Sequence, residues 1–182
     1  GHVIGSSIVH FNIGNGLHNF AYTGDLKYAR TNVLEAANTH FPRLETLMIE
    51  STYGGKENVM AENEADEYMV KVIQETFERG GKVLMPVLGS GRAQEVMIIA
   101  ERLMREKRIP EAPIYADGML WDITAIHTAY PEFMSRNMRE QIFHQEQNPF
   151  LSPFFKQVGS DKERKKIMLE EGTCLILATS GM

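Results

Sequence analysis

The spacing of apolar residues changes once along the chain, and its first third has the pattern of β-strands. Alternating apolar residues predict a strand over 8–13, with a return strand over 17–22, and a short apolar run predicts a third strand over 44–49. A glycine-rich turn, Gly14-Asn15-Gly16, separates the first two runs and predicts a hairpin. The third run is short and mostly apolar, which predicts a buried strand that ends at Glu50.

From about residue 60 the apolar spacing becomes helical. Helices are predicted over 62–79, 92–107, 119–130 and 160–171, and strands, the first of them buried, over 82–88, 113–116 and 173–178. Alternation of strands and helices predicts an α/β fold with a doubly wound, mostly parallel sheet. The compositional shift near residues 51–60 suggests two domains, 1–55 and 56–182.

Composition narrows the function classes. The net charge of −5 gives no overall attraction to nucleic acid, so such binding would require a local patch. Cys174 is the only cysteine, which excludes an internal disulfide framework and is typical of a reducing compartment. No apolar run is long enough to cross a membrane. We therefore expect a cytoplasmic protein without a membrane partner.

Candidate metal ligands lie in small-residue turns beside the first strands. His2 lies between Gly1 and Val3, Asp25 follows Gly24, and Glu50 opens the segment Glu50-Ser51-Thr52-Tyr53-Gly54. Imidazole and carboxylate groups both bind Zn²⁺, so His2 and Asp25 could form half of a zinc site. From spacing alone, a surface histidine, a turn aspartate and a capping glutamate remain alternatives.

A second candidate site lies where a predicted strand turns into a helix. The turn Gly89-Ser90-Gly91-Arg92 would direct backbone N–H groups and a guanidinium towards an anion. A tight turn with a salt-bridging arginine is the alternative. Asp117 and Ser180 also follow predicted strands, where ligands collect in such sheets. The basic residues of 162–166 are offset by acids, which predicts a solvated helix face.

Several motifs, taken together, resemble a known family. They are Gly1-His2-Val3-Ile4-Gly5-Ser6, Tyr22-Thr23-Gly24-Asp25, Glu50-Ser51-Thr52-Tyr53-Gly54, Gly91-Arg92-Ala93-Gln94-Glu95, Asn148-Pro149-Phe150 and Ser180-Gly181-Met182. In this order they resemble the metallo-β-lactamase-fold nucleases of the β-CASP group, most closely the archaeal relatives of the cleavage and polyadenylation specificity factor endonuclease. The resemblance implies the end of a metallo-β-lactamase domain followed by most of a β-CASP domain, incomplete at its C-terminus.

The resemblance also implies roles for individual residues. His2 would bind one zinc ion, Asp25 would bridge two, and Glu50 would orient a histidine beside the leaving group. Arg92 would face the nucleic-acid cleft, together with Ser90, Gly91 and Ser180. The complete enzyme would hold two zinc ions and hydrolyse phosphodiester bonds of single-stranded RNA in 3′-end processing or decay, with a homodimer as one expected assembly.

The chain also departs from the family pattern. The motif His-x-His-x-Asp-His and the later metal-binding histidines of the family are absent from its 182 residues. We therefore expect an internal fragment that binds little or no zinc and is inactive by itself. A small-molecule hydrolase of the same fold and a non-catalytic RNA-binding module are the alternatives, and zinc content separates the second from an enzyme.

Overall fold

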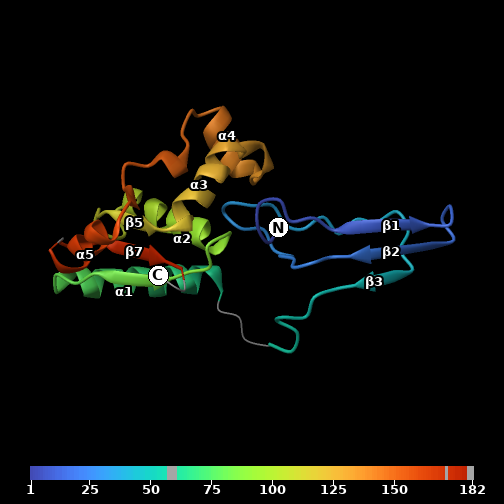
Figure 1. The fold of residues 1–182 in the computed structure, drawn as a ribbon, viewed down its shortest axis with the longest axis horizontal. Helices are drawn as coiled ribbons and strands as arrows, with labels where there is room; N and C mark the ends of the chain where they lie inside the picture. Colours follow the sequence, from blue (N-terminus) through green and yellow to red (C-terminus); the bar gives the residue numbers. More distant parts are fainter. Residues whose placement is uncertain (57–60, 171, 180–182) are drawn as a thin grey trace.

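The structure, a computed structural model, describes residues 1–56, 61–170 and 172–179 and contains two separate sheets. The first sheet has three strands in the order β1-β2-β3 and lies to one side of the remaining elements (Figure 1). Strand β1 (Val9–Ile13) pairs antiparallel with β2 (His18–Tyr22), which pairs parallel with β3 (Thr46–Met48). All three predicted strands are confirmed.

The predicted burial of the third strand is wrong. Leu47 and Met48 in β3 are 45% and 57% exposed. The segment before β3 is held mainly by polar contacts, because Asn19 donates its backbone and side-chain N–H groups to the Glu45 carboxylate. The Asn19 side chain is the main cause of a Glu45 pKa lowered to about 2. The apolar run therefore predicted the strand correctly but not its exposure to solvent.

The second sheet is wholly parallel, with strand order β4-β7-β5-β6. Its strands are β4 (Val83–Pro86), β5 (Ile114–Asp117), β6 (Phe155–Val158) and β7 (Leu175–Ala178). The helices are α1 (Glu62–Glu78), α2 (Arg92–Arg105), α3 (Met119–Ala129), α4 (Arg136–Phe143) and α5 (Asp161–Leu169), with short 3₁₀ turns at Pro131–Phe133 and Pro149–Leu151.

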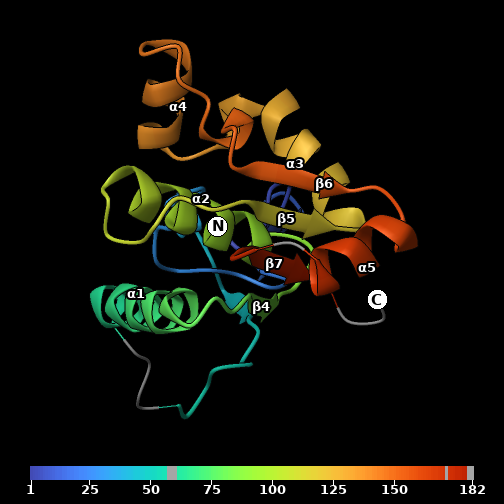
Figure 2. The same cartoon turned by 90° about the vertical axis from the view of Figure 1, so that its left-hand side faces the viewer.

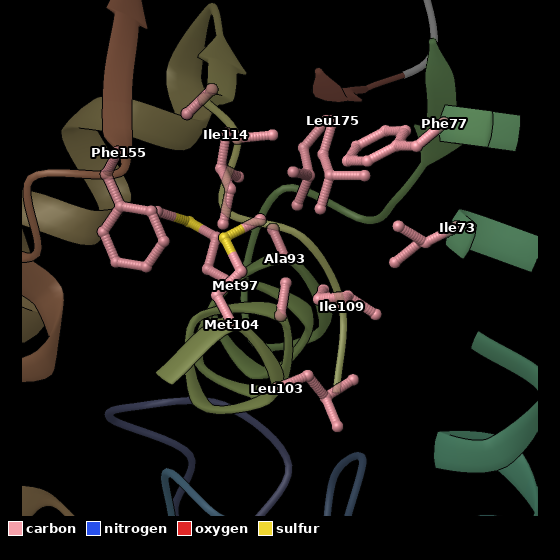
Figure 3. Packing of buried hydrophobic residues seen from close by; sticks show 14 of the residues in the cluster. Ile73, Phe77, Ala93, Met97, Leu103, Met104, Ile109, Ile114, Phe155 and Leu175 are labelled. Atoms are coloured by element: carbon pink, nitrogen blue, oxygen red, sulfur yellow. The ribbon is translucent and has the colours of Figure 1, made fainter. Parts of the chain in front are cut away.

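Helices cover both faces of this sheet, which confirms the doubly wound α/β fold (Figure 2). Successive strand residues point to opposite faces. Ile114 therefore joins the main core, whereas Tyr115 packs with the small cluster that contains Ile167 of α5. Figure 3 shows α1 and α2 contributing side chains to the same core. Its fully buried members include Ile73, Met97, Leu103, Met104, Ile114 and Leu175.

Strand β4 and the stretch before α5 differ from the predictions. The predicted buried strand over 82–88 is only partly buried, because Val83 and Met85 of this edge strand pack against the main core whereas Leu84, on the opposite face, is 62% exposed. Helix α4 and strand β6 lie in a polar stretch for which no element was predicted. Few buried apolar residues mark these elements in the sequence. Helix α4 buries Met138, and the two central residues of β6, Lys156 and Gln157, are exposed.

One ion pair changes the interpretation of α5. Arg164 lies in the basic run that predicted a solvated helix face, but its guanidinium binds the Asp117 carboxylate at the end of β5 through Nε at 2.5 Å and a second nitrogen at 3.0 Å. Asp117 is 3% exposed, and its side chain is the main cause of the raised Arg164 pKa. Both residues therefore help to hold α5 against the sheet, so Arg164 is not simply solvated.

A third cluster of buried residues joins the two parts of the chain. Val33 and Leu34, from the loop after β2, pack with Ile98 of α2, Met138 of α4 and Phe150. The loop therefore reaches from the first sheet into the α/β part, and it brings the candidate metal ligands close to the start of α2.

Candidate metal centre and nucleic-acid interface

The His2 turn is fixed by local hydrogen bonds. The Val3 backbone N–H donates to Ser6 Oγ at 3.1 Å, and the Ser6 N–H donates to the Val3 carbonyl at the same distance. Gly1 is tightly enclosed, because a Cβ at this position would lie 2.5 Å from the Lys27 carbonyl oxygen and 2.8 Å from the Ala37 nitrogen. The His2 turn therefore rests on the loop that follows Asp25.

Asp25 lies just beyond the end of β2 and close to His2. Thr23 continues the pairing of this strand by donating its N–H to the Met48 carbonyl at 3.1 Å, and Gly24 turns the chain with a φ of +56°. His2 Nε2 and Asp25 Oδ2 are 3.9 Å apart, and their side chains are 44% and 74% exposed. The structure therefore brings together the imidazole and the carboxylate that the sequence indicated.

Glu50 follows β3 on the neighbouring strand end. Its backbone N–H donates to Thr23 Oγ1 at 3.4 Å, and its carboxylate accepts the Thr52 N–H at 2.8 Å. These hydrogen bonds from Thr52 are the main reason that the Glu50 pKa is lowered, and the charge of His2 acts in the same direction. Glu50 therefore stays ionised near neutral pH, and it is close enough to His2 for the two side chains to interact electrostatically.

The geometry approaches that of part of a zinc site. Zinc binds nitrogen and oxygen at about 2.0–2.2 Å, so two ligand atoms of one tetrahedral ion lie about 3.3–3.6 Å apart. The 3.9 Å between His2 Nε2 and Asp25 Oδ2 is slightly longer, and both side chains are exposed enough to move closer when an ion binds. A hollow of about 310 Å³ beside Asp25 has a mixed lining that includes Ser6, Thr23 and His40. Across the described residues no three His, Cys, Asp or Glu side chains gather closely enough to hold a metal ion.

The start of α2 lies directly against the His2 turn. Gly91 has a φ of +80°, and a Cβ there would lie 2.8 Å from Val3 Cγ1 and 3.0 Å from the His2 carbonyl oxygen. Only a glycine permits both this backbone conformation and this close approach. Ser90, Gly91 and Arg92 are thereby placed near the candidate metal ligands.

Three of the backbone N–H groups that were predicted to face an anion already donate to acceptors within the chain. Gly91 N–H donates to Gln94 Oε1 at 2.8 Å, Arg92 N–H to the Ser90 carbonyl at 3.0 Å, and Ala93 N–H to the Leu88 carbonyl at 3.3 Å. An anion would have to compete with these internal acceptors. The side chain of Arg92, by contrast, is exposed.

Arg92 is exposed and makes no ion pair with any residue that the structure describes. The alternative of a salt-bridging arginine therefore finds no support in the described part of the chain. Ser180, the remaining residue predicted to contact nucleic acid, lies outside the described residues.

Sequence reasoning missed the functions of two residues in the same motif. Gln94 is fully buried and holds the turn from inside, since its amide donates to the Gly89 carbonyl and to Thr124 Oγ1. The Glu95 carboxylate accepts N–H groups from Asn32 and Val33 in the loop after β2. An acidic residue in the first turn of a helix normally indicates only a favourable helix dipole, so the sequence carried no signal for this longer contact.

Comparisons with known proteins identify the family. Residues 93–182 match the Beta-Casp domain. The chain is 55% identical over 183 aligned residues to the transcription termination factor FttA of Methanocaldococcus jannaschii, and covers 29% of that protein. It is 54% identical to FttA of Thermococcus kodakarensis and 55% identical to FttA of Pyrococcus abyssi. In each case the alignment covers the whole chain and 28% of the relative.

The chain belongs to the β-CASP family, as its motifs predicted. Its α/β architecture is that of the end of a metallo-β-lactamase domain followed by a β-CASP domain. It spans less than a third of the length of the FttA relatives that it matches. Of the helices that the structure describes, none is both long and apolar enough to span a membrane.

Proposed function

We propose that this chain is part of a zinc-dependent ribonuclease that hydrolyses single-stranded RNA and acts in transcription termination. One observation carries the proposal: an exposed His2–Asp25 pair, at 3.9 Å, lies beside the turn that presents the Arg92 guanidinium, which makes no ion pair within the described residues. Metal ligands beside a group that can bind phosphate suit phosphodiester hydrolysis. The archaeal relatives named transcription termination factors supply the proposed setting.

In this proposal the side chains have separate tasks. His2 and Asp25 would hold zinc together with ligands from elsewhere in the full-length protein. When bound, zinc lowers the pKa of a water molecule and neutralises charge that develops on the phosphate. Glu50, ionised because its pKa is lowered, would accept a hydrogen bond from a neighbouring histidine and fix its orientation.

Single-stranded RNA is the substrate that we favour. Its backbone can bend, and its unpaired bases can stack on side chains, so it can enter a cleft between two domains. The chain has a net charge of −5, which offers no general attraction to RNA. Binding would therefore depend on local groups such as Arg92, which is exposed and unpaired within the described residues.

A cleavage assay on the full-length zinc-loaded protein tests the proposal. We expect a labelled single-stranded RNA to be cut, cutting to stop when a chelator removes the metal, and cutting to return when zinc is restored. RNA binding without cleavage would instead support a non-catalytic binding module. Hydrolysis of a thioester or lactam without any cleavage of RNA would favour a small-molecule hydrolase of the same fold.

Arg92→Ala in the full-length protein should weaken RNA binding and flatten its salt dependence. Loss of one phosphate contact lowers the slope of log affinity against log salt concentration by roughly one unit. Arg92→Lys should restore binding only in part, since an ammonium group lacks the two-pronged geometry of guanidinium. A salt titration of RNA binding for the three proteins measures both effects, and an unchanged slope in Arg92→Ala would remove Arg92 from the RNA interface.

A further inference from the structure

We propose that Glu95 is a positioning residue that holds the loop carrying Asp25 against helix α2, and so keeps the His2–Asp25 pair in place. The importance of this pair rests on the proposed zinc-dependent function, whereas the contact between Glu95 and the loop does not depend on that function. Glu95 lies in the first turn of α2, four residues after Gly91, and it binds a segment 62 and 63 residues earlier in the chain.

The Glu95 carboxylate accepts three hydrogen bonds from the loop. One oxygen accepts the Asn32 backbone N–H at 2.8 Å and also its side-chain amide, and the other accepts the Val33 N–H at 3.1 Å. Hydrogen bonds to a charged acceptor are about twice as strong as neutral ones. The Val33 donor is also shielded from solvent, because Val33 is 2% exposed. These contacts bind one short segment of the loop firmly to the start of α2.

Helix α4 holds the same segment from the other side. Ser135, which is fully buried, donates its hydroxyl to the Asn32 carbonyl at 2.8 Å and its N–H to the Val33 carbonyl at 2.7 Å. The Arg136 N–H donates to Glu35 Oε1 at 2.6 Å. With Val33 and Leu34 in the shared apolar cluster, the loop is enclosed between α2 and α4.

This anchored segment is connected to both candidate metal ligands. Beyond it, the Ala37 N–H donates to the Lys27 carbonyl at 3.0 Å, which closes the loop two residues after Asp25. The enclosed Gly1 rests on these same two backbone groups and precedes His2 directly. Gly91, in the turn before Glu95, contacts the His2 carbonyl from the other side. Helix α2 therefore supports His2 through Gly91 and Asp25 through Glu95.

Removal of the Glu95 carboxylate should have effects that are typical of a positioning residue. When the Glu95 carboxylate is removed, the loop should lose its anchor on α2 and the Asp25 side chain should lose its fixed place beside His2. Arg92 stays at the exposed start of the helix, so RNA binding should change little. Residues that orient metal ligands from outside typically contribute 10–100-fold to metal affinity or activity.

The test compares Glu95→Ala and Glu95→Gln in the full-length protein with a matched control, Glu75→Ala. Glu75 lies on α1, and its contact is an exposed ion pair with Lys71 at 3.9 Å. In Glu95→Ala we expect hydrogen exchange at the Val33 amide to rise at least about tenfold and zinc affinity to fall about tenfold. At saturating zinc, kcat for RNA should fall about tenfold with KM within about twofold. Glu95→Gln should lie between Glu95→Ala and wild type.

Each outcome separates this proposal from the proposed function. Unchanged Val33 exchange and unchanged zinc affinity in Glu95→Ala would overturn it, whether or not the protein cuts RNA. A general loss of folding, with kcat and KM affected alike, would reduce Glu95 to a stability residue and would also overturn it. If the wild-type protein cuts no RNA, the proposed function fails, and the exchange and zinc measurements still decide the role of Glu95.

Discussion

Asp25→Asn in the full-length protein should reduce RNA cleavage about ten-thousandfold while the fold is retained. Asp25 is 74% exposed in its side chain, so the substitution removes no buried contact. A neutral amide is a poor ligand for two cations, because it lacks the charge and the two equivalent oxygens of a carboxylate. The metal-activated water would be lost with it, and this water supplies much of the rate.

Cleavage rates and zinc content measured on the same preparation check this prediction. Asp122→Asn is a suitable control, since Asp122 is an exposed acid in the first turn of α3. It should keep wild-type cleavage and zinc content. The bridging role of Asp25 would be wrong if Asp25→Asn retained more than about a tenth of the wild-type rate. An unchanged melting temperature in Asp25→Asn would show that the effect is local.

Asp25 and Glu95 would contribute to the same site in different ways. Asp25 would act on the reacting groups directly, whereas Glu95 would act by holding the loop that carries Asp25. If both proposals hold, combining the two substitutions should cost little more than Asp25→Asn alone, because residues that act as a unit are not additive.

Apolar spacing predicted the elements whose buried side chains recur regularly. The glycine pair Gly80-Gly81 predicted the end of α1, where Gly80 adopts a φ of +70° and donates its N–H to the Phe77 carbonyl. Apolar spacing missed α4 because this helix buries mainly Met138. It placed the end of the second helix slightly late, since α2 ends at Arg105 and Lys107 already has a φ of +58°.

The candidate site was predictable only in part, and for a physical reason. His2, Asp25 and Glu50 each follow or begin a small-residue turn, and the family motifs indicated their types of role. Contacts between distant segments gave no comparable signal in the sequence. Glu95 and Asn32 are 63 residues apart, and Asp117 and Arg164 are 47 apart. Each residue could also be explained locally: Glu95 as an acid that favours the helix dipole, Asp117 as a turn residue and Arg164 as part of a solvated helix face. The contacts between these distant residues are therefore visible only in the folded chain.

Glu50→Gln is expected to lower the rate of RNA cleavage by about 10–100-fold, the usual effect of losing a group that orients a neighbouring one from outside. The Glu50 pKa is lowered from 4.5, chiefly by the hydrogen bonds from Thr52. A carboxylate with a lowered pKa is fully charged above its ordinary pKa, and its contribution is lost only as the pH falls through the lowered value. Between about pH 5 and pH 8 its charge should therefore not change.

A rate profile over that pH range distinguishes this orienting role from general base catalysis. If Glu50 orients a neighbour, Glu50→Gln should lower the profile evenly and leave its shape unchanged. A general base with a pKa near 7 would give the wild-type profile an acid limb that disappears in Glu50→Gln. Glu75→Gln, at the exposed pair on α1, should reproduce the wild-type profile in both height and shape. Loss of the acid limb in Glu50→Gln would assign Glu50 to proton transfer and remove the orienting role proposed for it.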